Sequence, residues 1–217
     1  FITMKKYALL LVVVIFTITA KGQDADKAPY AIKYDFFTPV AGCFGFSLEL
    51  PRTNFTSLDI DAGLIGLKLG DYYSNTSFGG GYASIGPRYY FRKDELPKND
   101  MRGPYFKPQF LLNYFQYTYN YTYYEPVSNQ NIESEVTGSD FSANILLCMG
   151  SQWILSDLIV FDLWFGLGYG GDWTKEETNV PPEYFYEYNS RSYKYSHVHF
   201  GDSPMIFDGG LSIGLVF

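Results

Sequence analysis

Apolar residues alternate with small or polar residues along most of the chain. The pattern is clearest in 204–217, where the odd positions are large and apolar apart from Gly209 and the even positions include Asp208, Ser212 and Gly214. A period of two is that of a β-strand with one apolar face. The same period recurs upstream and predicts eight strands in all: 30–38, 42–50, 55–69, 82–94, 105–124, 140–154, 159–172 and 204–217.

Two of these segments change parity part-way along. In 55–69, Leu58 and Ile60 share one face before Ile65 takes the other, and in 105–124 the change falls between Tyr114 and Phe115. A β-bulge or the exit of the strand from a bilayer would each explain such a change.

The face opposite the apolar one is rich in Gly and Ser and carries few charges. It would make a poor surface for a soluble β-sandwich, which is the alternative, but it suits the narrow interior of a small barrel. The pattern therefore predicts an all-β fold, an eight-stranded antiparallel up-and-down transmembrane β-barrel with its apolar face toward lipid.

The first residues are typical of a signal for export. Met4, Lys5 and Lys6 precede a thirteen-residue apolar run from Ala8 to Ala20, which is shorter than the roughly 20 residues of a membrane-spanning helix. We expect a cleavable signal peptide at 4–22, with cleavage before Gln23, and a barrel domain at 23–217. Export of a barrel predicts an integral protein of the cell outer membrane.

The connections between strands alternate in length. With the N-terminus in the periplasm, turns are expected on that side at 51–54, 95–104 and 155–158. Outer connections are expected at 39–41, 70–81, 125–139 and 173–203. Short turns below and mostly longer loops above are the bacterial pattern.

Aromatic residues make up 20% of the chain, and many tyrosines lie in 114–124 and 184–195. Since a membrane strand needs only about 9–11 residues, half of 105–124 should stand above the bilayer. These tyrosines are interpreted either as an interfacial girdle or as a protruding ribbon that contacts a protein or glycan.

The alternating strands and the final residues 210–217 (Gly-Leu-Ser-Ile-Gly-Leu-Val-Phe) resemble small Gram-negative outer-membrane β-barrel proteins of the OmpA/OmpX kind. Residues 31–37 followed by Pro39 and 45–49 resemble the start of an outer-membrane beta-barrel domain family of unassigned function. The resemblance implies that Leu215 and Phe217 form a C-terminal signal read by the barrel-assembly machinery, although Ser212 stands where that signal usually has Gly. It implies no catalytic activity.

Charge and motifs add little further chemistry. The net charge of −7 argues against a nucleic-acid partner. His197 and His199 with Asp202 suggest a surface metal site, but no third soft ligand is evident. Ser196 beside His197 suggests a hydrolase, but adjacent residues of a strand point to opposite faces, so the two side chains would not hydrogen-bond directly. The strands that carry Cys43 and Cys148 lie opposite each other in the predicted barrel, which predicts two buried thiols rather than a disulfide. We expect no catalytic, cofactor-binding or metal site.

Parity places several charged side chains in the lumen, where an unpaired charge is costly. The predicted charge network, centred on the second, third and fourth strands, comprises Lys33, Asp35, Glu49, Asp59, Asp61, Arg88, Arg92, Asp162 and Asp208.

The sequence as a whole favours a non-enzymatic outer-membrane barrel. Its partners are expected to be outer-membrane lipid, the assembly machinery during insertion and a protein or glycan at the outer loops 125–139 and 173–203. A small pore and a lipid-modifying barrel enzyme are the alternatives.

Overall fold

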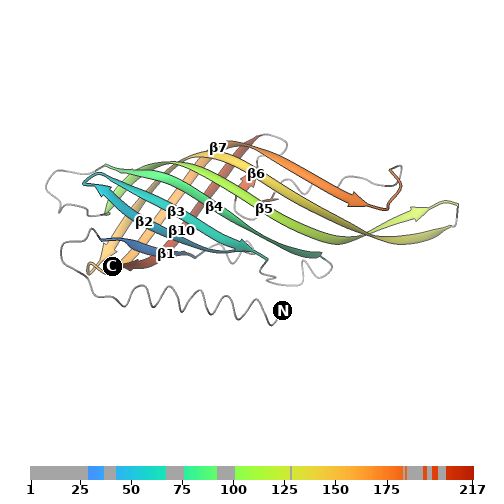
Figure 1. The fold of residues 1–217 in the computed structure, drawn as a ribbon, viewed down its shortest axis with the longest axis horizontal. Coiled ribbons are helices and arrows are strands. Elements are labelled where there is room, and N and C mark those ends of the chain that lie inside the picture. Colours follow the sequence, from blue (N-terminus) through green and yellow to red (C-terminus); the bar gives the residue numbers. More distant parts are fainter. Residues whose placement is uncertain are drawn as a thin grey trace.

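Eight strands form a closed antiparallel ring in the computed structural model of the chain (Figure 1). The structure describes residues 29–36, 43–66, 76–91, 101–127, 129–182, 184, 193–194, 197–199 and 204–217. The strands of the ring are β1 (Ala31–Asp35), β2 (Cys43–Thr53), β3 (Thr56–Ile65), β4 (Thr76–Tyr90), β5 (Gly103–Glu125), β6 (Gln130–Leu155), β7 (Ile159–Thr178) and β10 (Met205–Val216). A short hairpin of β8 (Tyr193–Lys194) and β9 (His197–His199) adds to β10.

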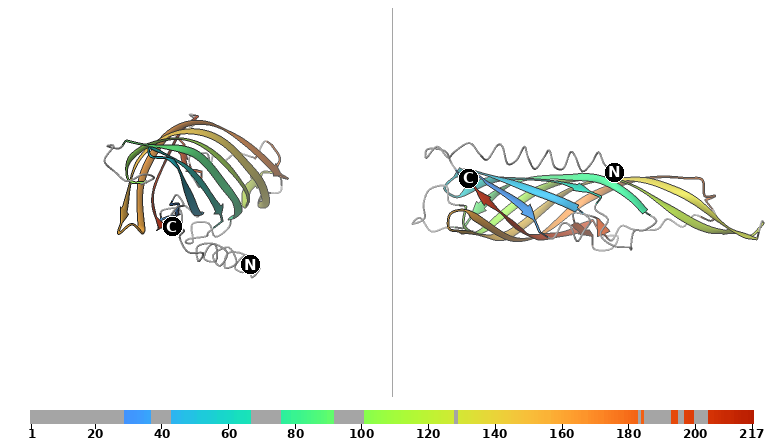
Figure 2. Two further views of the ribbon diagram at one scale, coloured as in Figure 1. Left: turned by 60° about the vertical axis from the view of Figure 1, so that its left-hand side comes forward. Right: turned by 90° about the horizontal axis from the view of Figure 1, so that it is seen from below.

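Each strand of the ring pairs with its neighbours in the order of the chain, and β1 closes the ring by pairing with β10. This closing seam runs from Ala31 opposite Val216 to Asp35 opposite Ser212. Two backbone hydrogen bonds between Tyr30 and Phe217 extend it at the chain ends. The views in Figure 2 show the strands curving around a shared interior. The predicted fold class, an eight-stranded up-and-down ring, is confirmed.

The alternation decides which side chains face inward. On β2, for example, Cys43, Ser47 and Glu49 are buried, whereas Phe44 and Phe46 on the other face are only partly buried. Side chains of successive residues point to opposite faces of a strand, so one parity fills the lumen and the other covers the outer surface. The described part of the chain contains no helix long and apolar enough to cross a membrane.

The two ends of the ring differ. At the turn end, short connections join β2 to β3 and β6 to β7, and the C-terminus lies there. At the opposite, extended end, β5, β6 and β7 run well past the other strands (Figure 1). The prediction of an outer loop at 125–139 is therefore wrong for most of this segment, because β6 begins at Gln130 and pairs with β5 from there on. Residues 173–178 likewise belong to β7.

The change of parity in 105–124 is not a bulge. The register between β5 and β6 is continuous from Gly103 opposite Gln152 to Glu125 opposite Gln130. Phe110 and Tyr114 are exposed on the outer face, whereas Phe115 and Tyr117 lie on the inner face of the same regular strand. The change of parity therefore marks the level, just beyond Tyr114, at which the outer face becomes polar and the aromatic residues continue on the inner face.

The change in 55–69 has a similar explanation. β3 keeps one register with β4 from Thr56 to Ile65, and Ile65 is a buried inward residue near the end of the strand. It packs with Cys43 and Phe115 inside the ring.

Glycines allow the strands to approach closely. Gly79, Gly80 and Gly81, which the sequence analysis places in the outer connection 70–81, lie within β4. A Cβ atom on Gly80 would come 2.2 Å from the backbone oxygen of Tyr114 on the neighbouring strand β5. Only glycine fits at this contact.

Candidate functional site

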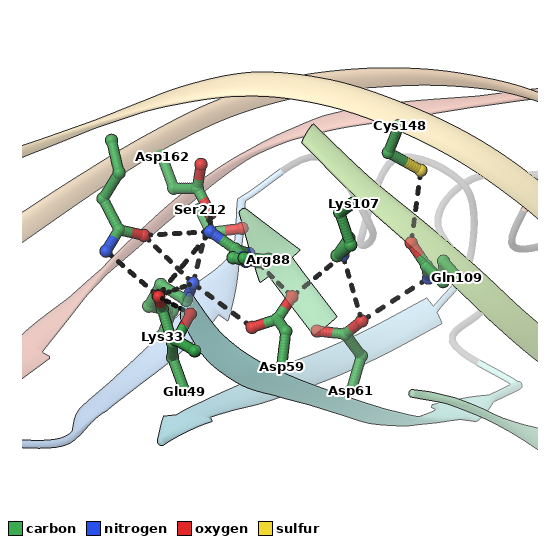
Figure 3. Close-up of polar contacts among 12 residues, drawn as sticks. Lys33, Glu49, Asp59, Asp61, Arg88, Lys107, Gln109, Cys148, Asp162 and Ser212 are labelled. Carbon is green, nitrogen blue, oxygen red and sulfur yellow. Dashed lines mark hydrogen bonds and ion pairs between the residues drawn. The ribbon is translucent and has the colours of Figure 1, made fainter. Parts of the chain in front are cut away.

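Arg88 lies at the centre of a buried network of charged side chains in the lumen (Figure 3). Its Nη2 donates to Asp59 Oδ2 at 2.7 Å, and its Nη1 donates to Asp162 Oδ2 at 2.6 Å. The guanidinium therefore joins β3 to β7 across the interior, while its carbon lies 4.3 Å from the centre of the Tyr105 ring. The forked shape of a guanidinium allows it to bind two carboxylates at once.

Lys33 adds a second cation to the same carboxylates. Its Nζ lies 3.0 Å from Glu49 Oε2, 3.4 Å from Asp59 Oδ1 and 3.1 Å from Asp162 Oδ2. Lys33, Glu49, Asp59 and Asp162 are each 0% exposed. Buried charges of both signs in direct contact offset much of the desolvation cost that each would have alone.

Neutral side chains fill the remaining hydrogen-bonding positions of these carboxylates. Ser57 Oγ donates to Glu49 Oε1 at 2.6 Å, and Tyr90 also donates to Glu49. Tyr105 donates to Asp162 Oδ1 at 2.8 Å. A buried ionic network is stable only when such positions are satisfied.

Lys107 extends the network toward the extended end. Its Nζ lies 2.8 Å from Asp59 Oδ2 and 3.6 Å from Asp61 Oδ2. Asp61 also accepts hydrogen bonds from Ser84 and, at 3.5 Å, from Gln109. The connected group thus holds three cations and four carboxylates: Lys33, Arg88 and Lys107 with Glu49, Asp59, Asp61 and Asp162.

Two described residues of the predicted network, Asp35 and Asp208, make their hydrogen bonds outside this group. Asp35 accepts a hydrogen bond from Ser212 at 2.7 Å, and Asp208 accepts one from the backbone of Gly209 at 2.8 Å. Both lie on inward positions of strands at the seam. Arg92 lies outside the described residues.

Sequence reasoning missed Lys107 and Gln152. The Gln152 amide receives hydrogen bonds from Lys33 and Arg88, each at 3.1 Å, and donates to Glu49 at 3.0 Å. Both residues could have been found by the same alternation, because Lys107 lies between the outward Phe106 and Pro108, and Gln152 precedes the outward Trp153.

Apolar side chains close the lumen on both sides of the network. Toward the turn end lies a cluster of Ala31, Tyr90, Met101, Tyr105, Val160 and Val216. Toward the extended end lies a second cluster of Leu111, Leu146, Cys148 and Ile206, with Tyr82 and Trp164 packed against it. The network is therefore a polar layer between two apolar layers.

Tyr82 lies flat against the inner wall because two glycines leave it room. A Cβ atom on Gly45 would come 1.9 Å from the Tyr82 hydroxyl, and one on Gly63 would come 2.3 Å from its ring. Gly45 and Gly63 face each other on β2 and β3. The ring thus crosses two strands toward Asp35, whose Oδ2 lies 3.5 Å from the hydroxyl.

Both cysteines are buried as thiols. Cys43 lies on β2 and Cys148 on β6, and the Cys148 thiol donates to Gln109 Oε1 at 3.4 Å. Among the described residues, no group of three or more His, Cys, Asp or Glu side chains is placed to hold a metal ion. His197 and His199 contribute backbone to β9, whereas Ser196 and Asp202 lie outside the described residues.

The outer surface of the ring carries a continuous apolar belt. Along β6 and β7 its exposed side chains are large, and Ile145 is 66% and Phe165 55% exposed. The belt includes Leu64, Ile85, Phe110, Phe141, Ile145, Leu147, Met149, Trp153, Leu163, Phe165, Leu167 and Leu215. Patches of this extent on a water-exposed surface are rare and mark contact with an apolar phase or partner.

The belt ends along one line at the extended end. Tyr114, Phe141 and Trp173 are direct neighbours on β5, β6 and β7. The next outward residues, Gln116, Ser139 and Lys175, are also direct neighbours and are polar. The change from apolar to polar outward residues therefore falls at the same level on three adjacent strands, immediately beyond these three aromatic residues.

No family model matches the chain. No curated protein matches it either. Among solved structures, the chain is similar to the crystal structure of CarO from Acinetobacter baumannii, with a TM-score of 0.44 and 10% identity over 90% of this chain and 100% of that chain.

Beyond the line of Tyr114, Phe141 and Trp173, β5, β6 and β7 form a wall with two different faces. The outer face carries exposed polar residues, among them Asn120, Thr122, Glu133 and Glu135. The inner face carries the half-buried Tyr117, Tyr119, Tyr121 and Tyr123. Tyr123 stacks on Tyr184 at 5.5 Å between ring centres, and Tyr121 donates to the Tyr184 backbone oxygen at 3.0 Å, so part of this face contacts the chain after β7.

Proposed function

We propose that the chain is an integral barrel of the Gram-negative outer membrane that has no enzymatic activity and no open channel. It holds the wall of β5, β6 and β7 outside the cell, where this wall contacts a protein or glycan. The observation that carries the proposal is the common line at which the apolar belt ends on three adjacent strands.

The height of the belt supports the membrane location. On β6 the aromatic residues Phe141 and Trp153 stand near its two ends. With a rise of about 3.3 Å per residue and a tilt of roughly 40°, this stretch spans roughly 30 Å, close to the hydrocarbon thickness of a bilayer. Aromatic side chains at both ends of such a belt are typical of membrane barrels.

The filled lumen favours a closed barrel over a small pore. Arg88, Lys33 and Lys107 cross the interior and are held by carboxylates from the surrounding strands. The apolar clusters on either side leave this layer 2% exposed or less at each of the three cations. An eight-stranded barrel has an interior just wide enough for such side chains to fill.

The polar outer face of the extended wall supports surface contact. Asn120 donates to Glu133 at 2.7 Å across β5 and β6, and Thr122 and Glu135 stand exposed beside them. Hydroxyl, amide and carboxylate groups on a regular sheet offer hydrogen bonds to a protein or glycan at fixed spacing.

Cysteine labelling on intact Gram-negative cells tests the location and the orientation together. Thr122→Cys, on the extended wall, is expected to react with a membrane-impermeant maleimide. Arg52→Cys, exposed at the turn end, is expected to react only after the cells are permeabilised. The native thiols are buried and give a low background. Equal labelling of both variants in intact cells would contradict the proposed orientation.

We also expect Phe217 to act as an assembly signal. Deleting it should lower the amount of protein in the outer membrane, measured by quantitative blotting of membrane fractions. Because the Phe217 ring stacks on Tyr30 at 5.4 Å, its loss also removes a contact at the seam. Tyr30→Ala is the matched control, since it removes the same stack from the other strand. If both variants lowered the amount equally, the effect would be one of seam packing, and the signal would be rejected.

A further inference from the structure

Four polar side chains lie together on the inner wall, beyond the apolar cluster of Leu111 and Leu146. Asn113 on β5 is the direct neighbour of Ser142 on β6, and Ser142 is the direct neighbour of Asp172 on β7. Asn144 is the next inward residue of β6. Side chains opposite each other on one face of adjacent strands lie about 5 Å apart. These four residues are called the polar row below.

The two amides of the polar row are buried with hydrogen-bonding capacity to spare. Asn113 is 2% exposed, and neither its Oδ1 nor its Nδ2 has a partner within the described part of the chain. Asn144 is 1% exposed; its Nδ2 donates to Ser142 at 3.3 Å, while its Oδ1 accepts no hydrogen bond from the described residues. Buried amides in proteins almost always have partners, in the protein, in water or in a ligand.

Gly170 holds the Asn144 amide in this position. The two residues are direct neighbours on β7 and β6, and a Cβ atom on Gly170 would come 1.8 Å from Asn144 Oδ1. Any larger residue would displace the amide. The wall is therefore shaped around an amide oxygen that has no partner among the described residues.

The described charged residues around the polar row are negative. On β5, β6 and β7 beyond Lys107, the inward charged residues up to the level of Tyr119 are Asp140, Asp172 and Glu176. Lys175 is exposed on the outer face, and no other Lys or Arg occurs in this part of the three strands. Among the residues that the structure describes, the cations that lie buried in the lumen are those of the ionic network below.

Beyond the polar row, the next inward residue of β5 is the buried Phe115, and the tyrosine rings of Tyr117 and Tyr119 follow it. Tyr117 and Tyr119 stack at 6.2 Å between ring centres, and Tyr117 donates to Glu176 at 2.7 Å. The faces of such rings attract cations. Carboxylates and amide oxygens at the polar row, with tyrosine faces beyond Phe115, favour a positively charged, hydrogen-donating molecule.

We propose that the polar row binds a small organic cation that carries an ammonium group next to an oxygen atom. An ammonium group has three donors and no acceptor, so it suits the oxygens of Asn144, Asn113 and Asp172. The Asn113 amide nitrogen remains to donate to the neighbouring oxygen of the same molecule. A metal ion fits less well, because the described residues bring no three His, Cys, Asp or Glu side chains together as ligands.

Calorimetric titration of the refolded full chain in detergent micelles tests this site, with ethanolamine as the probe. Saturable binding is expected for ethanolamine and none for ethylene glycol, which is similar in size but uncharged. Asp172→Asn and Asn113→Leu should each weaken binding about tenfold or more, the effect of losing one hydrogen bond to a charged group. Glu135→Gln is the matched control, because it removes a carboxylate from the outer face of β6 and should leave binding unchanged.

Gly170→Ala provides an independent variant. It keeps every polar atom of the row but displaces the Asn144 amide, so it should also weaken ethanolamine binding. Folding of each variant is checked by its heat-dependent mobility on gels, and a variant that does not fold is replaced by another of the three.

Three results would overturn the proposal. The first is no saturable binding of ethanolamine to the wild type, which would mean that only water contacts the buried amides. The others are binding of ethylene glycol as strong as that of ethanolamine, and a loss of ethanolamine binding in Glu135→Gln as large as in Asp172→Asn. The proposal requires the closed ring but no bilayer, so its failure would leave the membrane location untouched.

Discussion

Arg88→Ala is expected to lower the free energy of unfolding of the refolded barrel by about 3–5 kcal/mol, the usual effect of breaking a buried ion pair. The side chain is 2% exposed and contacts Asp59 and Asp162 on opposite sides of the lumen. Its removal leaves two buried carboxylates with less positive charge nearby, and their desolvation is then poorly offset. Lys33 remains within 3.4 Å of both carboxylates. Because it still offsets part of their charge, we expect the loss of stability to lie toward the lower end of this range.

Urea unfolding in detergent micelles, followed by tryptophan fluorescence, measures this effect. Lys175→Ala is the control, because Lys175 and its partner Glu177 are exposed on the outer face and should not shift the midpoint. Arg88→Lys keeps the positive charge but loses the forked shape of the guanidinium. Because a single ammonium group cannot contact both carboxylates in the same way, this variant should recover only part of the lost stability. An unchanged midpoint for Arg88→Ala would mean that water, rather than Arg88, satisfies the lumen carboxylates.

The strands and their inner and outer faces could be predicted wherever one face is apolar. Inside the belt, outward Phe, Leu and Ile alternate with small or polar inward residues, and the predicted faces of β2, β4 and β10 match the buried positions. Beyond the belt this signal disappears. Glu133, Glu135 and Thr137 point outward, while Ser134 and Val136 point inward, so neither face of β6 is consistently apolar there. The sequence therefore suggests a loop where β6 is a paired strand.

The membership of the ionic network depends on height along the barrel as well as on parity. Parity places Lys33, Asp35, Asp162 and Asp208 in one lumen, but the tilt and stagger of the strands decide which of them meet. Lys33 on β1 and Asp162 on β7 lie 3.1 Å apart, although β10 stands between their strands. Stagger of this kind is a property of the closed ring and is not encoded in any single strand.

Leu147→Arg is expected to reduce insertion of the protein into liposomes strongly. Leu147 lies on the outward face of β6, midway between Phe141 and Trp153, and is 56% exposed. An arginine at the bilayer midplane of a membrane barrel costs about 2–4 kcal/mol, whereas near the interface it costs about 0–1 kcal/mol. The folded fraction after mixing with liposomes, read from heat-dependent mobility on gels, measures the effect.

Thr137→Arg is the matched control for this substitution. Thr137 lies on the same outward face of the same strand, but beyond the line of Tyr114, Phe141 and Trp173, where the surface is already polar. We therefore expect it to insert like the wild type. The contrast depends only on the position of each residue relative to that line. Equal insertion of Leu147→Arg and Thr137→Arg would mean that the apolar belt does not face lipid, and the exposed Leu, Ile and Phe side chains would then have to be covered by protein instead.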